Sequence, residues 1–232
     1  LFALVGCMMF TQCNGYLDTS SPSNMDDEFV TSSPAETLKI LSRCYAIYRE
    51  SCTLGYNWND HFCSDIEYFP ENNSSNNINA KLVPEQVPCD FVKDPFNALY
   101  SAISYASKAI ALVSEKQQYN EDIAAGKTSE WTHLKGEAET IRAFCYFELV
   151  KHFGDVPYKY ENNYVDDYTL TSRFVILDEL IETIKVAKPY MYKVGEGGIN
   201  GERMSRTFAD ALIGKMALYA GGYQTIRTDI AD

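Results

Sequence analysis

Basic residues are scarce in this sequence of 232 residues. It has 20 Lys and Arg against 32 Asp and Glu, which gives a formal net charge of −12. That charge repels phosphate backbones, and no basic stripe runs along the chain, so nucleic-acid binding is disfavoured. Tryptophan is also rare, with 2 residues, whereas the chain has 17 Tyr and 12 Phe. Tyrosine suits both wet packing and flat polar ligands such as sugars, and composition alone does not separate these two uses.

The apolar run at residues 1–10 is too short to span a bilayer, because a spanning helix needs about 20 apolar residues. The run matches the apolar region of a secretory signal peptide, and a buried first helix is the alternative. Two cysteines can end such a signal. Leu4-Val5-Gly6-Cys7 resembles the lipobox of bacterial lipoproteins, whereas Cys13 lies where the apolar run gives way to polar residues. We favour Cys13 as the lipidated residue and expect residues 14–34 to form an extended tether.

Motifs for metal binding and catalysis are missing. The sequence contains no CxxC, HExxH or GxSxG pattern, and its 3 His are dispersed. The acidic run at residues 26–28 lacks the register of a calcium loop. Besides Cys7 and Cys13, five cysteines remain, an odd number that leaves at least one of them unpaired in an exported chain. They are Cys44, Cys52, Cys63, Cys89 and Cys145. We therefore expect no metal site, no cofactor and no enzymatic activity.

Helical periodicity covers most of the remaining chain. Apolar residues recur at three- and four-residue steps over about 35–50, 96–113, 130–152, 177–187 and 208–219. Small residues such as Gly136, Ala138 and Ala143 suit closely packed helix pairs. No segment reads convincingly as a strand. The pattern predicts an all-α chain of about five helices, arranged as divergent tetratricopeptide-like pairs.

Residues at the helix ends support these boundaries. Ser33, followed by Pro34, and Ser129 are expected N-caps. The helix at 130–152 is apolar on two faces, so it must be packed from two sides. It should end at Gly154, in a left-handed conformation, before Pro157. Inside it, Arg142 needs an acidic or carbonyl partner, and Glu139 and Asp155 are the candidates.

A long irregular loop insertion, about residues 51–93, interrupts the helical pattern. Such a long connection is either functional or floppy. Its segment 55–73 combines one Trp with short amide and carboxylate groups. A flat aromatic ring beneath a sugar and polar groups at its hydroxyl rim form a typical saccharide site. The candidate ligand-binding residues are Trp58, Asn57, Asp60, His61, Asp65 and Tyr68. The alternative is that Trp58 only anchors the loop on the helices.

The segment Gly136-Glu-Ala-Glu-Thr-Ile-Arg-Ala-Phe-Cys-Tyr-Phe-Glu-Leu-Val-Lys-His-Phe-Gly-Asp-Val-Pro-Tyr158 resembles the signature of the SusD/RagB family. That signature often reads GEA-x-x-x-RA-x-x-YF-x-L-V, then two residues and FGDVP. Three further segments are similar to the family: the start at residues 13–18, the helix at 174–188 and the helix at 209–220. The resemblance therefore covers essentially the whole chain.

The resemblance implies a non-catalytic, surface-exposed lipoprotein of the outer membrane, anchored through Cys13. Such proteins capture glycans or similar nutrients and pass them to a TonB-dependent barrel transporter of the SusC type. The implied fold has a tetratricopeptide-like helical scaffold, and its loops contact the ligand. Residues 35–232 then correspond to the N-terminal portion of the family domain. A helical protein-interaction scaffold that binds no carbohydrate is the alternative function. The chemistry of the signature itself, capping and packing, indicates a scaffold role.

Overall fold

The computed structural model describes residues 27–52, 90–158 and 169–222, and within these ranges the chain is mostly helical. This confirms the predicted all-α fold class. The helices are α1 (Asp27–Val30), α2 (Pro34–Ser51), α5 (Asp90–Ser114), α6 (Gln117–Ala124), α7 (Glu130–Phe153), α8 (Arg173–Ala187), the 3₁₀ turn η4 (Lys188–Tyr190) and α9 (Arg206–Ala220). Most of the predicted loop insertion, at 53–89, lies outside the described residues.

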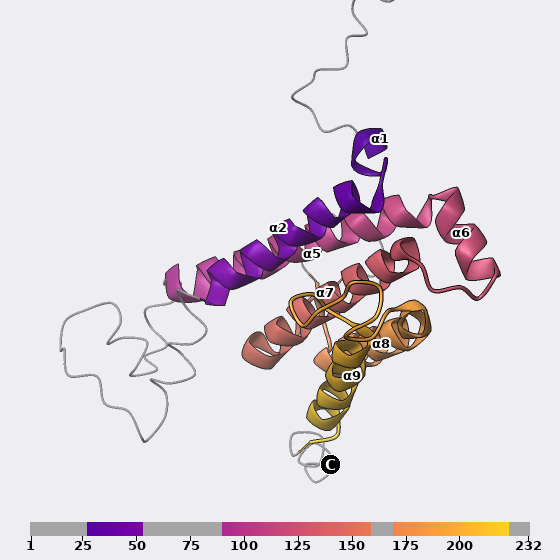
Figure 1. Ribbon diagram of the computed structural model, residues 1–232. Coiled ribbons are helices and arrows are strands. Elements are labelled where there is room, and N and C mark those ends of the chain that lie inside the picture. Colours follow the sequence, from indigo (N-terminus) through magenta and orange to yellow (C-terminus); the bar gives the residue numbers. More distant parts are fainter. Residues whose placement is uncertain (1–26, 53–89, 159–168, 223–232) are drawn as a thin grey trace, which may run out of the picture.

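Consecutive long helices are neighbours in space. α5 packs against both α2 and α7, α7 packs against α8, and α8 packs against α9 (Figure 1). α2 and α5 run in opposite directions along each other, as in a stacked helical hairpin. α7 lies in the middle and is buried along almost its whole length, because its apolar residues occupy two faces. The core contains Leu41, Leu99, Ile141, Tyr146, Leu149, Leu177 and Leu180.

The ends of α7 show why the helix has these limits. The Ser129 side chain accepts a hydrogen bond from the Thr132 backbone N–H, and the Thr132 hydroxyl accepts one from the Ser129 N–H, which forms a capping box. At the other end Gly154 has φ 74° and ψ −125°. The predicted positive φ is present, but ψ lies outside the left-handed helical region. Gly154 is needed here because its φ is one that other residues rarely adopt.

The structure differs from the prediction that no strand is present. β1 (Val156–Pro157) pairs antiparallel with β2 (Leu170–Thr171). Each strand has two residues, too few to produce an alternating pattern in the sequence. β1 follows α7 directly, so this small sheet sets the direction in which the chain leaves the helix.

Three helices differ from the sequence prediction: two are additional, and one begins earlier than expected. α6 was not predicted, because a helix of 8 residues with only Asp122 buried has no apolar stripe to recognise. α5 begins at Asp90, several residues before the expected start, and includes Pro95. α1 lies within the expected extended tether, where the Thr37 hydroxyl donates a hydrogen bond to the Val30 carbonyl (2.9 Å).

Candidate functional site

The predicted ligand-binding and lipidation residues lie outside the described part of the chain. Asn57, Trp58, Asp60, His61, Asp65 and Tyr68 fall within 53–89, and Cys13 falls within 1–26. The saccharide site in the loop therefore stays a prediction. Two features of the described residues bear on function: the buried contacts of the signature segment, and a groove beside it.

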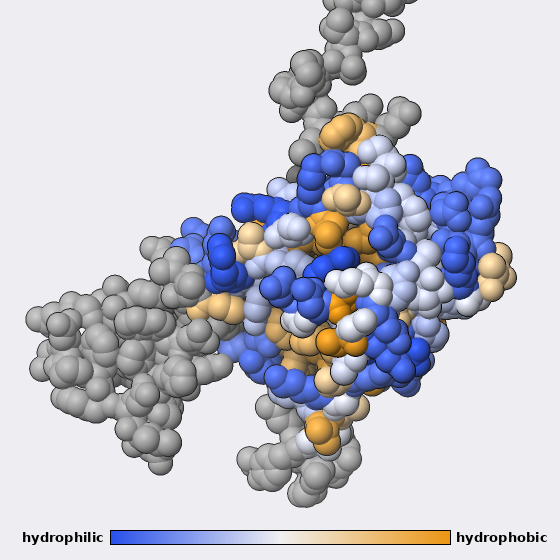
Figure 2. All heavy atoms as spheres, viewed as in Figure 1, coloured by the Kyte–Doolittle hydropathy of each residue, from blue (hydrophilic) through white to orange (hydrophobic). Residues whose placement is uncertain are grey.

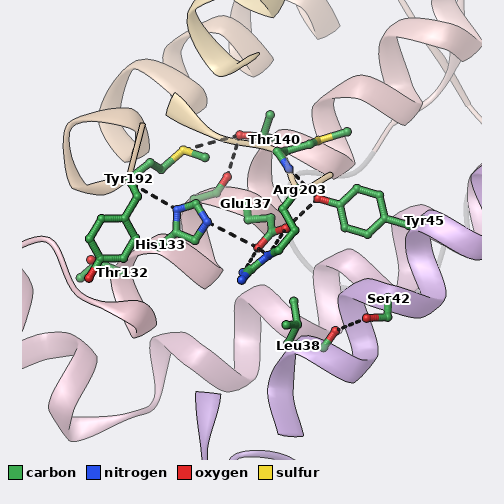
Figure 3. A network of polar contacts seen from close by, with 12 residues as sticks. Leu38, Ser42, Tyr45, Thr132, His133, Glu137, Thr140, Tyr192 and Arg203 are labelled. Carbon is green, nitrogen blue, oxygen red and sulfur yellow. Dashed lines mark hydrogen bonds and ion pairs between the residues drawn. The ribbon is translucent and has the colours of Figure 1, made fainter. Parts of the chain in front are cut away.

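Glu137, the second residue of the signature, is fully buried on α7. Its carboxylate accepts hydrogen bonds from the Tyr45 hydroxyl (2.7 Å) and from Arg203 Nε (3.1 Å), and Arg203 Nη2 donates to its second oxygen. The backbone N–H of Met204 in turn donates to the Tyr45 hydroxyl (2.8 Å). Figure 3 shows these side chains converging from α2, from α7 and from the loop before α9. Glu137 thus joins three segments that are distant in sequence.

His133 lies one helical turn before Glu137 and is also buried. Its Nδ1 accepts a hydrogen bond from the Tyr192 backbone N–H (3.2 Å), so the neutral ring carries its proton on Nε2. Within the described residues Nε2 has no hydrogen-bond partner, and it lies 3.8 Å from Glu137 Oε2. Burial, reinforced by the positive charge of Arg203, lowers the pKa of His133 to about 4. The ring is therefore neutral at physiological pH.

Gly136, the first residue of the signature, allows the segment after α8 to approach α7. A Cβ at this position would lie 2.4 Å from Met191 Cγ and 2.8 Å from Met191 Sδ. Met191 is itself buried, so its side chain has little room to move away. Glycine is favoured at this position, because a side chain here would force Met191 to shift within a packed core.

We expect Gly136→Ala to lower the free energy of unfolding by about 1–2 kcal/mol, because overpacking against Met191 outweighs the better helix propensity of Ala. Urea denaturation measures the change. The matched control is Gly214→Ala on α9, where a new Cβ meets nothing within 4 Å. That control should raise stability by about 0.5–1 kcal/mol. Equal effects at the two sites would contradict this account of Gly136.

The sequence offers two candidate partners for Arg142, Glu139 and Asp155. The carboxylate of Asp155 accepts a hydrogen bond from the Arg173 backbone N–H (3.0 Å) at the start of α8. The carboxylate of Glu139 experiences the positive charges of Lys135 and Arg142. The FGDVP turn thus connects the end of α7 to the beginning of α8, which agrees with a scaffold role for the signature.

A groove of about 740 Å³ opens between α6, the first half of α7 and α8. Two tyrosines, Tyr119 on α6 and Tyr190 on η4, line it together with the aliphatic side chains of Ile123, Val186 and Ala187. Its acidic residues are Glu139, Asp178, Glu179 and Glu182. No local sequence pattern predicts this groove, because its lining comes from four separate elements.

Three lining residues of this groove are linked by polar contacts. Lys135 Nζ donates a hydrogen bond to the Tyr119 hydroxyl (3.0 Å) and lies 3.4 Å from Glu139 Oε1. Burial raises the pKa of Glu139, although the charges of Lys135 and Arg142 act in the opposite direction. For Lys135, burial opposes the charged form, but Glu139 and Tyr119 outweigh it and hold the pKa above its usual value. Lys135 therefore stays charged, and its ammonium group already contacts Tyr119 and Glu139.

The described residues contain no group of three or more His, Cys, Asp or Glu that could hold a metal ion. In the same part of the chain, no helix combines the length and the apolar character needed to cross a membrane.

The stacked helices, the buried polar links and an open groove define an all-α scaffold of the kind that presents a binding surface. Comparison with known families identifies the scaffold. A SusD-like family model, described as starch-binding and associating with the outer membrane, matches residues 15–188, well over half of the chain. The chain belongs to this SusD-like family, as the resemblance of residues 136–158 implied. No curated protein and no solved structure matches the chain at a significant level.

Proposed function

We propose that this protein captures glycans at the cell surface, without cleaving them, and delivers them to a TonB-dependent, SusC-like transporter of the outer membrane. The family match over residues 15–188 is the observation that supports it, since the family is described as starch-binding and associating with the outer membrane. The scaffold contacts of Gly136 and Glu137 agree, because they fix the helices in place and leave recognition to other parts of the chain.

In this proposal Cys13 is lipidated and anchors the protein to the outer membrane. Several acyl chains on one cysteine give firm attachment, whereas a single chain gives only marginal membrane binding. Growth with a labelled fatty acid should mark the wild-type protein and leave Cys13→Ala unlabelled. Label retained by Cys13→Ala and lost from Cys7→Ala would move the anchor to Cys7.

The ligand is proposed to bind at the loop, with Trp58 beneath a sugar ring and Asn57, Asp60, His61, Asp65 and Tyr68 supplying hydrogen-bonding groups. A protein of this kind gains affinity from a few aromatic and polar contacts and needs no reacting group. Prolonged incubation with bound polysaccharides should therefore release no new reducing ends. Release of reducing ends would instead indicate a hydrolase.

We expect Trp58→Ala to weaken binding of the best oligosaccharide about tenfold or more, because one aromatic anchor often contributes much of the binding energy at a site. Titration calorimetry measures this, with a panel that includes malto-oligosaccharides. The chain has 2 Trp, so in Trp131→Phe the only indole left is that of Trp58. Its fluorescence should then change when the glycan is added.

Two outcomes would contradict the loop site. In the first, the fluorescence of Trp131→Phe does not respond to any bound glycan, and Trp58→Ala binds as tightly as the wild type. In the second, no carbohydrate binds at all, and pull-downs recover only protein partners. The second outcome would favour the protein-interaction scaffold.

A further inference from the structure

The groove between α6, α7 and α8 has the dimensions of a ligand site. Its volume of about 740 Å³ lies within the range of small-molecule pockets, which is roughly 300–1,000 Å³. Gly136 and the buried Glu139 lie on the α7 side, and the exposed carboxylates of Asp178 and Glu182 lie on the α8 side. Its described lining residues come from α6, α7, α8 and η4.

Apolar surface lines the groove at both sides. The ring of Tyr119 and the side chain of Ile123 come from α6, and Tyr190 comes from η4. Val186 on α8 is 73% exposed, although it is a large aliphatic residue within a concave surface. Ring faces and aliphatic side chains of this kind suit the apolar CH faces of a sugar ring, which are interrupted by hydrogen-bonding groups.

Acidic groups outnumber basic ones in the described lining of the groove. Its carboxylates are those of Glu139, Asp178, Glu179 and Glu182, and its ammonium group is that of Lys135. Glu182 also pairs with Lys185 (2.6 Å), so the excess of negative charge comes mainly from Asp178 and Glu179. That ammonium is already occupied by Glu139 and the Tyr119 hydroxyl. A concave surface lined by one sign of charge concentrates ligands of the opposite sign and repels those of its own. On the face seen in Figure 2, hydrophilic side chains gather over α6 and α8, the two elements that border the groove.

We propose that this groove is a second binding site, and that it accepts a saccharide that carries free amino groups, such as an oligomer of glucosamine. The apolar rings would pack on the sugar faces, and the carboxylates would accept hydrogen bonds from the ammonium groups. Charge-assisted hydrogen bonds of this type are stronger than neutral ones. The choice of a saccharide rests on the proposed function, whereas the requirement for positive charge rests on the groove itself.

The test compares three tetrasaccharides on the full chain by calorimetry: glucosamine tetramer, its N-acetylated form and a galacturonate tetramer. We expect the glucosamine tetramer to bind, and its affinity to fall as salt is raised. The N-acetylated form should bind at least about tenfold more weakly, since it lacks the charge, and the galacturonate should not bind. Equal binding of the three, or no binding of the glucosamine tetramer, would overturn the proposal.

Variants locate the site. Asp178→Asn with Glu182→Gln removes two exposed carboxylates of the groove and should weaken binding of the glucosamine tetramer about tenfold. The matched control, Glu36→Gln with Glu50→Gln on α2, removes the same charge outside the groove and should change binding less than twofold. Unchanged melting temperatures would show that all variants fold. Equal losses in the two double variants would mean general charge attraction and would overturn the site.

Two further measurements separate this proposal from the loop site and from another ligand class. Trp58→Ala should still bind the glucosamine tetramer while losing neutral glycans. Loss of both ligands in Trp58→Ala would mean one shared site and would overturn the second one. Tetralysine supplies amines without sugar rings and should bind at least about tenfold more weakly than the glucosamine tetramer, because only the sugar matches the apolar lining. Equal affinity would overturn the saccharide assignment.

Discussion

Glu137→Ala is expected to lower the free energy of unfolding by about 3–5 kcal/mol, the range observed when one partner of a buried ion pair is removed. The change leaves the Tyr45 hydroxyl and the Arg203 guanidinium without their shared carboxylate. Arg203 is 26% exposed and can be partly solvated, which favours the lower end of the range. Urea denaturation measures the loss. It should be accompanied by a fall in melting temperature of roughly 10 °C, for a chain of this size.

The same substitution at an exposed carboxylate provides the control. Glu182 on α8 forms an exposed pair with Lys185 (2.6 Å), and its side chain is 68% exposed. Surface pairs of this kind contribute roughly 0–1 kcal/mol, so Glu182→Ala should leave stability nearly unchanged. A further variant tests the pairing itself: Glu137→Leu with Arg203→Met removes both charges and should recover much of the stability lost in Glu137→Ala. If Glu137→Ala costs no more than Glu182→Ala, the buried network does not stabilise the fold.

His133 should make stability depend on pH. Its pKa falls from 6.5 in the unfolded chain to about 4 in the fold. Between these pH values the unfolded chain binds a proton that the folded chain does not, so stability falls as pH decreases through this window. A shift of this size corresponds to about 3 kcal/mol. The contribution is complete above the unfolded pKa of 6.5 and is lost by pH 4.

Asparagine at position 133 isolates this effect, because its amide oxygen can replace Nδ1 as acceptor for the Tyr192 N–H but has no titrating proton. Carboxylates also titrate in acid, so the difference between His133→Asn and the wild type is the relevant quantity. We expect the variant to lose less stability than the wild type between pH 6.5 and pH 4. If the free energies of unfolding of the two proteins fall equally over that range, His133 is not buried in its neutral form.

Most long helices could be predicted from the sequence, because amphipathic periodicity reports which residues face a core. The prediction succeeded for α2, α7, α8 and α9, where apolar residues repeat. Ser caps mark the starts of α2, α7 and α9, and glycines follow the ends of α7 and α9. It failed for α6, whose single buried residue, Asp122, gives no stripe. It also failed for the two short strands, which are formed by pairing between residues 156–157 and 170–171. Local patterns contain no information about such partners.

The features of the candidate sites depend mostly on contacts between distant segments, which the sequence does not reveal. The roles of Gly136 and Glu137 depend on tertiary contacts, since their partners, Met191 and Arg203, are more than 50 residues away in sequence. A glutamate among apolar residues of a two-faced helix was the one available signal for the buried carboxylate. The groove offered no signal, because exposed acids on α8 look like an ordinary solvated face.

By itself, the sequence determined the helical class, through periodicity, and the family, through the segment 136–158 and its match to the SusD-like model. Both follow from short-range order along the chain. Only the tertiary structure decided that Glu137 unites α2, α7 and the loop before α9, and that α6, α7 and α8 border a groove rich in carboxylates. These features depend on which distant segments meet, and that is set by packing of the whole core rather than by any local pattern.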